Sequence, residues 1–204
     1  MIELAPGLYY YPEFFSSIQQ RKLIEAVNNV VANAPLFVPR MPRTGKPFSV
    51  RMTNCGSLGW LSDASRGYRY EPLHPDTGEP WPPIPDCILH AWRETAGCAA
   101  LPEACLINMY DPGTRMGLHQ DRDEQALDVP VVSISLGSDC LFRFSGTERR
   151  GPTKSLRLRS GDVVTIGGQS RLCFHGVDRI YSGTSQLVEG GGRVNLTLRR
   201  VSPV

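Results

Sequence analysis

The front of the chain carries two stretches in which apolar residues recur at helical spacing. In the first, residues three and four positions apart form one face of an amphipathic helix; they are Leu23, Ile24, Val27, Val30 and Val31. Ser16 and Ser17 precede this stretch as N-cap candidates and Pro35 follows it, so we expect a helix between them. A second helix is expected over about 86 to 96, with an inward face of Ile88, Leu89 and Trp92. Both helices are expected to pack on a sheet.

The segment between these helices, from Pro39 to Pro85, is polar and rich in proline and glycine. A structureless connection of that length is uncommon in a compact domain, and where it occurs it is usually functional. We therefore expect a functional loop region here rather than a simple connector.

After residue 103 the pattern changes to short apolar or alternating runs at close intervals. Turn signals separate the runs, among them Asp111-Pro112-Gly113 and Ser160-Gly161. The predicted strands cover 104 to 110, 129 to 136, 140 to 145, 155 to 159, 162 to 166, 171 to 175 and 193 to 201. Strands at this spacing without intervening helices indicate a sandwich or jelly roll. The chain is thus predicted to be mainly β with flanking helices, in the α+β class.

The last predicted strand alternates strictly between apolar and polar side chains. Its apolar face is Val194, Leu196 and Leu198, and its polar face is Arg193, Asn195, Thr197 and Arg199. One interpretation is a half-buried strand whose polar face meets water. The other is a polar face that looks into a barrel, where guanidinium groups bind carboxylates. Arg193 and Arg199 lie about 20 Å apart on a strand that rises roughly 3.3 Å per residue, so they would approach a short dicarboxylate from opposite ends.

Composition limits the classes of protein that fit. A chain of 204 residues with 41% hydrophobic residues can form one domain with a substantial core, so a single domain over 1–204 is expected. We find no signal-peptide pattern and no apolar stretch of membrane-spanning length, and we expect a cytoplasmic monomer without membrane or protein partners. The six cysteines include no C-x-x-C pair, so neither a zinc knuckle nor a disulfide framework is indicated.

Charge is unevenly distributed along the chain. Residues 139 to 204 hold 11 Lys and Arg against 5 Asp and Glu, or +6, whereas residues 1 to 138 hold 11 against 15, or −4. The basic half contains a local cluster made of Arg149, Arg150, Lys154, Arg157 and Arg159. Such a cluster is either a solvated face or a surface that contacts phosphate groups.

Two histidines and an aspartate form the leading candidate site. His119 and Asp121 are spaced as H-x-D after the largely apolar residues 116 to 118, which predicts that both lie at a strand end with side chains on one face. With the distant His175 they would complete the two-His, one-carboxylate facial triad of a non-haem Fe(II) oxygenase. An isolated H-x-D is more often a pair of surface polar residues. His74, in a turn, and His90, on the second helix, are interpreted as ordinary polar residues.

Taken in order, these motifs resemble the AlkB family of Fe(II)/2-oxoglutarate-dependent dioxygenases, and its bacterial members in particular. The order is Asn108-x-Tyr110, His119-x-Asp121, His175 and then R-x-N-x-T-x-R at 193 to 199. Similar segments begin with MTNCGSLGW at 52 to 60 and continue through LINMY, LHQDRDE, VVSISLG, GDVVTIGG and CFHG. The resemblance implies a double-stranded β-helix, or jelly roll. Its core would cover about 104–204, with an N-terminal helical and loop-rich nucleotide-recognition lid over about 36–84.

The same resemblance implies an activity, direct reversal of alkylation damage. Enzymes of this kind oxidatively demethylate N-alkylated bases of the 1-methyladenine and 3-methylcytosine type. They use Fe(II), O2 and 2-oxoglutarate, and release succinate, CO2 and formaldehyde. The implied partner is alkylated single-stranded or duplex DNA, with RNA as a further candidate.

Roles for individual residues also follow from the resemblance. It implies that the metal ligands are His119, Asp121 and His175. Arg199 and Tyr110 would hold the distal carboxylate of 2-oxoglutarate. The metal-proximal end and its surroundings would be served by Asn108, Arg193 and Asn195.

A base methylated at a pairing nitrogen is cationic near neutral pH, so an aromatic surface beside a carboxylate suits it. The candidate aromatic residues are Trp60, Tyr68 and Tyr70. Asp123 supplies a carboxylate, and Arg149 matches a position that approaches substrate in the family. The SGTERR segment around Arg149 and the loop from 40 to 46 depart from the family pattern, which leaves the choice of DNA or RNA open.

Three functions therefore compete. The first is a base demethylase, and the second is a 2-oxoglutarate oxygenase acting on tRNA or a protein side chain. The third is a non-catalytic β-roll that binds nucleic acid and keeps a vestigial metal site. A charged interior strand argues against the third, because a vestigial site has no reason to bury charge.

Overall fold

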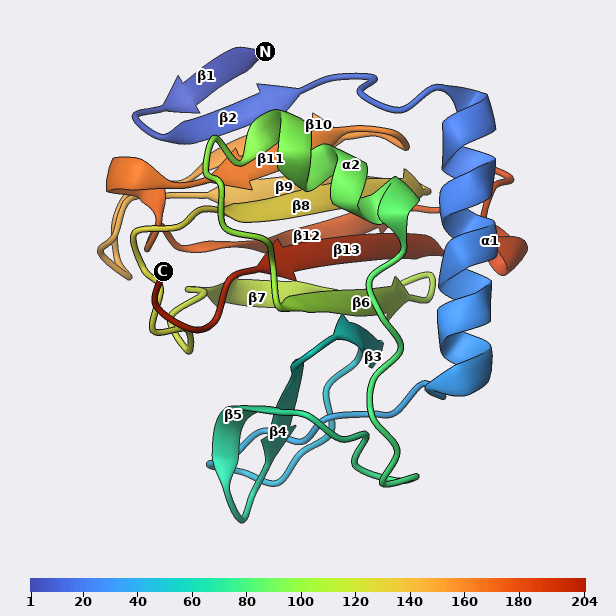
Figure 1. The fold of residues 1–204 in the computed structure, drawn as a ribbon. Coiled ribbons are helices and arrows are strands. Elements are labelled where there is room, and N and C mark those ends of the chain that lie inside the picture. The colour runs from blue at the N-terminus through green and yellow to red at the C-terminus, as the bar shows by residue number, and fades with distance from the viewer.

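The computed structural model describes residues 1–204 as two antiparallel sheets, a separate hairpin and two helices (Figure 1). The larger sheet has seven strands in the order β1-β2-β11-β8-β13-β6-β3. These are β1 (Ile2–Ala5), β2 (Leu8–Tyr11), β11 (Val163–Ile166), β8 (Val131–Gly137), β13 (Arg193–Arg199), β6 (Ala104–Tyr110) and β3 (Arg51–Gly56). The smaller sheet has four, in the order β10 (Lys154–Leu158), β9 (Asp139–Phe144), β12 (His175–Tyr181) and β7 (Met116–His119). The hairpin pairs β4 (Gly59–Asp63) with β5 (Gly67–Glu71).

Two helices cover one face of the larger sheet, and the smaller sheet lies against the other face (Figure 1). The helices are α1 (Ser17–Asn33) and α2 (Asp86–Thr95). Ser16 caps α1 through a capping box, accepting from the Gln19 N–H at 3.4 Å while its own N–H donates to Gln19 Oε1 at 2.9 Å. Both helices were predicted, although Leu89 is only half-buried. Neither helix combines the length and apolar character needed to cross a membrane.

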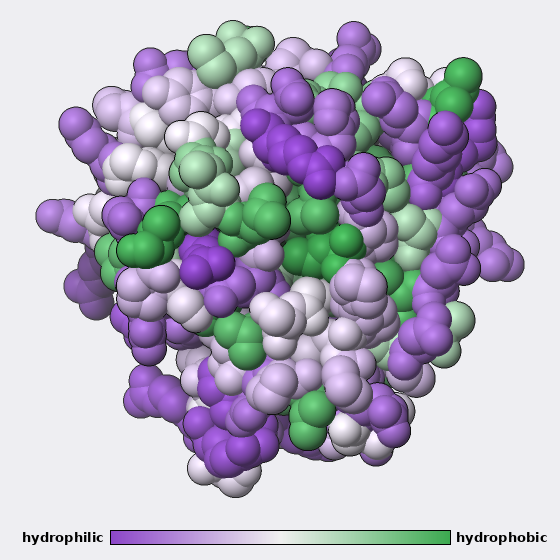
Figure 2. Space-filling model, in the orientation of Figure 1, coloured by the Kyte–Doolittle hydropathy of each residue, from purple (hydrophilic) through white to green (hydrophobic).

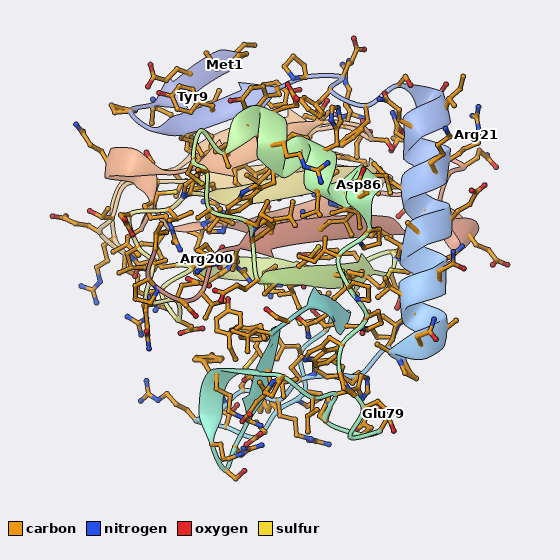
Figure 3. All side chains as sticks on the ribbon, viewed as in Figure 1. Met1, Tyr9, Arg21, Glu79, Asp86 and Arg200 are labelled. Carbon is orange, nitrogen blue, oxygen red and sulfur yellow. The ribbon has the colours of Figure 1, made fainter.

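The larger sheet separates two apolar cores. One core contains helix residues such as Leu23 and Trp92 together with Leu196 of β13. The other joins the two sheets, for example Ile166 of β11 with Phe142 of β9. Strand side chains alternate between these cores, as the period of two requires. The solvent side of α1 is polar: Figure 3 shows Arg21 pointing outward, and the surface over that helix in Figure 2 is mostly hydrophilic.

The polar face of β13 points into the space between the sheets rather than into water. Arg193 is 1% exposed, and Thr197 and Arg199 are each 6% exposed. The apolar face, with Val194 and Leu198, belongs to the helix-side core. Of the two interpretations of this strand, the barrel interior is therefore the right one.

The front of the chain contains more sheet than its sequence indicated. β3 pairs with β6 along its whole length, and β2 pairs with β11. Residues 8–11, before the expected 104–204 core, and residues 51–56, inside the segment expected to form the lid, are therefore strands of the larger sheet. The sequence pattern did not indicate β3 because two of its buried residues, Thr53 and Asn54, are polar. Both are fully buried, and Thr53 donates to the Ala34 carbonyl at 2.8 Å.

The strand expected over 171 to 175 is wrong. Residues Gly168–Ser170 form a 3-10 turn, and β12 starts only at His175. Its continuation to Tyr181 contains the exposed pair Asp178 and Arg179, beside a register shift against β9. An irregularity of this kind interrupts the alternation from which the strand could have been recognised.

Candidate metal centre and its cavity

His119, Asp121 and His175 meet where β7 and β12 pair. His119 ends β7, His175 begins β12, and the two are direct partners in the antiparallel register. His119 Nε2 lies 3.8 Å from Asp121 Oδ1, and His175 Nε2 lies 3.7 Å from Asp121 Oδ2. One ligand atom from each residue lies within 4.8 Å of the others, so a single ion can contact all three. Asp121 lies two residues after the end of β7. The alternation of side chains along a strand therefore does not explain why its carboxylate faces the two histidines.

Backbone carbonyls orient the two imidazoles. His119 Nδ1 lies 2.9 Å from the Gly117 oxygen, and His175 Nδ1 lies 3.1 Å from the Cys173 oxygen. Hydrogen bonds at these positions place the ring proton on Nδ1 and leave Nε2 free for a metal. Burial lowers the pKa of His175 to about 4, so this ring is neutral near neutral pH.

Asp121 is buried and ionised. Burial by itself would raise the pKa of this carboxyl, but Arg199 and the two histidines hold it well below its usual range. Arg199 Nη2 donates to Asp121 Oδ1 at 2.8 Å, whereas Oδ2 has no hydrogen-bond donor within the protein. A buried anionic oxygen without a donor is costly unless an external group neutralises it. It fits a cation.

A second buried carboxylate, Glu124, belongs to the same cluster. Arg171 Nη2 donates to Glu124 at 3.1 Å, Arg199 Nε lies 3.4 Å from it, and the Tyr70 hydroxyl donates to it. Arg171 also donates to the backbone carbonyl of Asp121 at 2.6 Å. Two guanidinium groups thus face two carboxylates, which provides the pairing that buried charges require.

Farther along β13, polar residues form successive rungs with β6. Arg193 is paired with Tyr110, and Asn195 with Asn108. Arg193 donates to Ser135 Oγ at 2.8 Å, but its Nε has no partner, and neither does Asn108 Oδ1. Burial raises the pKa of Tyr110 well above its usual value, so its hydroxyl stays protonated and can donate. These unpaired polar atoms fit an organic acid between the sheets.

The positions of the two arginines of β13 differ from those that the expected roles suggest. The resemblance implies Arg199 with Tyr110 on a distal carboxylate and Arg193 near the metal. In the structure Arg199 contacts Asp121, and Arg193 lies beside Tyr110. The sequence predicts the distance between the two arginines along the strand, but it does not predict which of them lies next to the metal ligands.

An aromatic pair on the hairpin stands next to a carboxylate. The rings of Trp60 and Tyr68 stack with centroids 5.6 Å apart and planes at 23°. Trp60 Nε1 donates to Asp123 Oδ2 at 2.9 Å, and Phe48 meets Trp60 edge-on. Tyr70 is not part of this stack, because its hydroxyl turns to Glu124.

One cavity of about 490 Å³ connects these features. Of the thirteen residues expected at the metal, cosubstrate and substrate sites, all but Tyr70 line it. A neighbouring cavity of about 470 Å³ shares Arg115 and Arg149 with it and adds Arg143. The guanidinium of Arg149 lies 6.0 Å from the centre of the Phe174 ring. Three arginines thus line these two cavities, and one of them, Arg143, lies 3.4 Å from Asp178.

Comparisons with known proteins agree with this site. A family model described as 2OG-Fe(II) oxygenase superfamily matches residues 7–199. The chain is 52% identical over 199 residues to the alpha-ketoglutarate-dependent dioxygenase AlkB homolog of Caulobacter vibrioides, covering 98% of this chain and 90% of that one. It is 41% identical over 202 residues to the alpha-ketoglutarate-dependent dioxygenase AlkB of Escherichia coli K12, covering 97% and 91%.

This chain belongs to the AlkB family of 2OG-Fe(II) oxygenases.

A solved structure, that of OsALKBH1, superposes with a TM-score of 0.79 at 29% identity, over 98% of this chain and 100% of that one. The two antiparallel sheets and two helices therefore follow the AlkB-family architecture and are consistent with a double-stranded β-helix. Membership implies Fe(II) and 2-oxoglutarate as cofactor and cosubstrate. The residues present fit both: two imidazoles and an ionised carboxylate suit Fe(II), and the unpaired Arg193 Nε beside the protonated Tyr110 hydroxyl suits a carboxylate.

Sequence reasoning missed several residues of this AlkB-type site. Glu124 and Arg171 are bonded to each other across 47 residues, and no spacing rule connects them. Phe48 lies in the expected functional loop region but was not singled out within it, and Arg115 follows the turn signal at 111 to 113. A signal existed only for Glu124, since it continues the HQDRDE segment that carries Asp121.

Proposed function

We propose that this protein oxidatively demethylates nucleic-acid bases alkylated at ring nitrogens, of the 1-methyladenine and 3-methylcytosine type. The observation that carries the proposal is the single cavity in which the metal cluster meets an aromatic pair and a carboxylate. The bacterial AlkB proteins named above support it, since both are called alpha-ketoglutarate-dependent dioxygenases. Removal of the alkyl group restores the original base, so the activity reverses alkylation damage directly.

His119, Asp121 and His175 hold the metal in this proposal. When bound, Fe(II) and 2-oxoglutarate supply the oxidation of the N-methyl group by O2, which yields succinate, CO2 and a hydroxymethylated base that loses formaldehyde. The protein fixes the geometry. Carbonyl oxygens orient both imidazoles, and Arg199 holds one oxygen of Asp121 so that the other points to the metal.

The cosubstrate lies along β13. Arg193 and Tyr110 bind its distal carboxylate, because they are register partners with protonated donors deep between the sheets. Asn108 and Asn195, one rung nearer to Arg199, contact the metal-proximal end. The oxo acid is thus oriented along the strand before it reacts, which lowers the entropic cost of reaction.

The methylated base stacks on the Trp60 and Tyr68 surface. Methylation at a pairing nitrogen makes the ring cationic, and Asp123 beside Trp60 attracts that charge. Because Asp123 lies two residues from Asp121, a base held there has its methyl group next to the metal cluster. The lid is then the β4–β5 hairpin with the loop before it, a narrower segment than 36–84.

Phosphate groups of the substrate strand meet the basic surface outside the cavity. Arg115 and Arg149 border both cavities, and Arg143 lines the outer one. Guanidinium groups bind phosphates through paired hydrogen bonds, which suits this position. DNA is the substrate we favour, and RNA is tested beside it.

The experiment is a mass assay on oligonucleotides that carry one 1-methyladenine or 3-methylcytosine, in DNA and in RNA, with Fe(II), 2-oxoglutarate and O2. We expect the loss of one methyl group, with formaldehyde and succinate formed in equal amounts. Asp121→Ala should abolish turnover because it removes the anionic ligand. If no oligonucleotide reacts while cell extract stimulates 2-oxoglutarate consumption, the substrate is tRNA or a protein side chain instead.

A further inference from the structure

The β4–β5 hairpin is attached to the segment that follows Asp121 by two hydrogen bonds. Trp60 of β4 and Tyr70 of β5 are direct partners across the hairpin, so their side chains lie on the same face. The Trp60 indole donates to Asp123, and the Tyr70 hydroxyl donates to Glu124. Both strands of the hairpin are thus anchored to consecutive residues just beyond the metal carboxylate.

Tyr70 is the anchor that reaches buried charge. Its acceptor, Glu124, is 5% exposed and also binds Arg171 at 3.1 Å, with Arg199 at 3.4 Å. Arg199 in turn donates to the Asp121 carboxylate at 2.8 Å, and Arg171 donates to the Asp121 backbone carbonyl at 2.6 Å. A continuous path of hydrogen bonds and ion pairs therefore leads from the hairpin to the metal carboxylate. Burial raises the pKa of Tyr70 well above its usual value, so the phenol remains a donor.

The hairpin has other hydrogen bonds to the body, from the Asn54 side chain to the Trp60 backbone, from Ser62 to the Arg40 carbonyl and from Trp81 to the Glu71 carbonyl, but none of these bonded groups is charged. It forms a two-stranded sheet of its own and belongs to neither of the large sheets. Figure 1 shows it projecting from the body below β3. Isolated two-stranded hairpins are marginally stable, so their order depends on tertiary contacts. A contact that leads to the metal carboxylate can transmit the state of that carboxylate.

We propose that Tyr70 is a positioning residue that couples the order of the β4–β5 hairpin to loading of the metal site, through Glu124, Arg171 and Arg199. The inference rests on the metal assignment of the proposed function. A metal bound to Asp121 fixes that carboxylate, and with it the two arginines and the acceptor of Tyr70. By linkage, an ordered hairpin strengthens metal binding by the same factor. The surface that receives the base is therefore assembled when the iron site is loaded.

The test is hydrogen–deuterium exchange of the full chain without O2, in the metal-free state and with Mn(II) plus 2-oxoglutarate. In the wild type we expect loading to slow exchange in residues 59–71 by at least about fivefold, the lower end of usual coupling energies. In Tyr70→Phe, which loses only the hydroxyl, loading should change hairpin exchange less than about twofold. Titration of metal-free protein with Mn(II) should show weaker binding in this variant by the same factor.

Tyr68→Phe is the matched control, because it removes the same group from the same strand, at a residue that is 49% exposed. It should retain the wild-type response. If Tyr70→Phe speeds hairpin exchange equally in both states, the tyrosine is only structural and the coupling is refuted. The coupling is also refuted if the wild-type hairpin does not respond although β13 becomes protected. If β13 itself gains no protection from Mn(II) and 2-oxoglutarate, the metal and cosubstrate assignment fails, and this inference fails with it.

Discussion

At the scale of single residues, surroundings decide what identical side chains do. Arg193 and Arg199 share a strand and a face, yet one lies beside Tyr110 and the other against Asp121. We propose that the guanidinium beside Asp121 orients the metal site and that the one beside Tyr110 binds an incoming carboxylate. Substitution of Arg193 should therefore weaken 2-oxoglutarate binding, whereas substitution of Arg199 should first weaken metal binding.

Arg193→Lys keeps the charge but loses the planar pair of donors. We expect the affinity for 2-oxoglutarate to fall by about 10- to 100-fold, since a charge-assisted hydrogen bond contributes roughly 1.5–3 kcal/mol. Calorimetric titration of the Mn(II)-loaded protein measures this. Arg199→Lys is the comparison, and it should weaken Mn(II) binding first. Equal losses of 2-oxoglutarate affinity in both variants, with Mn(II) binding intact, would contradict the assignment.

Two substitutions of Trp60 distinguish the contribution of its stacking surface from that of its hydrogen bond to Asp123. Trp60→Ala removes a stacking surface that contributes about 1–3 kcal/mol per base, so KM for a methylated oligonucleotide should rise about 5- to 150-fold with kcat nearly unchanged. Trp60→Phe keeps a ring but loses the donor to Asp123 and should have a smaller effect. Steady-state kinetics with varied oligonucleotide provides the measurement. A fall in kcat at constant KM would place Trp60 outside the base site.

At the scale of elements, the metal cluster depends on how closely two strands approach. A Cβ built on Gly176 of β12 would lie 2.5 Å from the Met116 oxygen and 2.7 Å from the Gly117 oxygen. Only a residue without a side chain lets β7 and β12 pair at this point. The pairing matters because each strand carries one of the two histidines.

Gly176→Ala should therefore push β7 away and separate His119 from His175. We expect Mn(II) affinity to fall by about tenfold or more, the range seen when ligand support is disturbed. Far-ultraviolet circular dichroism should still report a folded β protein. Gly117→Ala is a matched control, because nothing lies within 4 Å of its added Cβ. Unchanged Mn(II) affinity in Gly176→Ala would show that β7 and β12 can move apart without disturbing the metal ligands.

At the scale of the whole molecule, charge is uneven along the sequence, with −4 over residues 1 to 138 and +6 over residues 139 to 204. Arg115, from the first part, and Arg149, from the second, line both cavities. A strand of nucleic acid that places a base in the cavity must pass this surface. Its phosphates release counterions on binding, and this makes affinity depend on salt.

Binding of a methylated single strand should weaken with salt, with a slope of about −0.7 in log–log form for each phosphate contact. Arg149→Ala should reduce that slope by about 0.7 if it contacts one phosphate. Arg21→Ala, on the outer face of α1 (Figure 3), should leave the slope unchanged. Fluorescence anisotropy at several salt concentrations provides both values. Equal effects of the two substitutions would mean that binding is diffuse over the molecule.

Local pattern and motif order determined much of this protein. The 3.6-residue period predicted both helices, because each buries one face, and short apolar or alternating runs between turn signals predicted β6, β8 and β13. The ordered motifs indicated the AlkB family. Of the thirteen expected site residues, all but Tyr70 line the cavity, although their individual roles stay predictions.

Tertiary structure alone decided the rest. It placed β3 in the larger sheet beside the distant β6, where the polar residues Thr53 and Asn54 are buried and Thr53 bonds to Ala34. It decided which arginine meets Asp121, and it joined Glu124 to Arg171 and Tyr70 across the chain. Contacts between residues far apart in sequence leave no periodic pattern in the sequence. Their energy comes from burial and charge pairing, which exist only after the chain has folded.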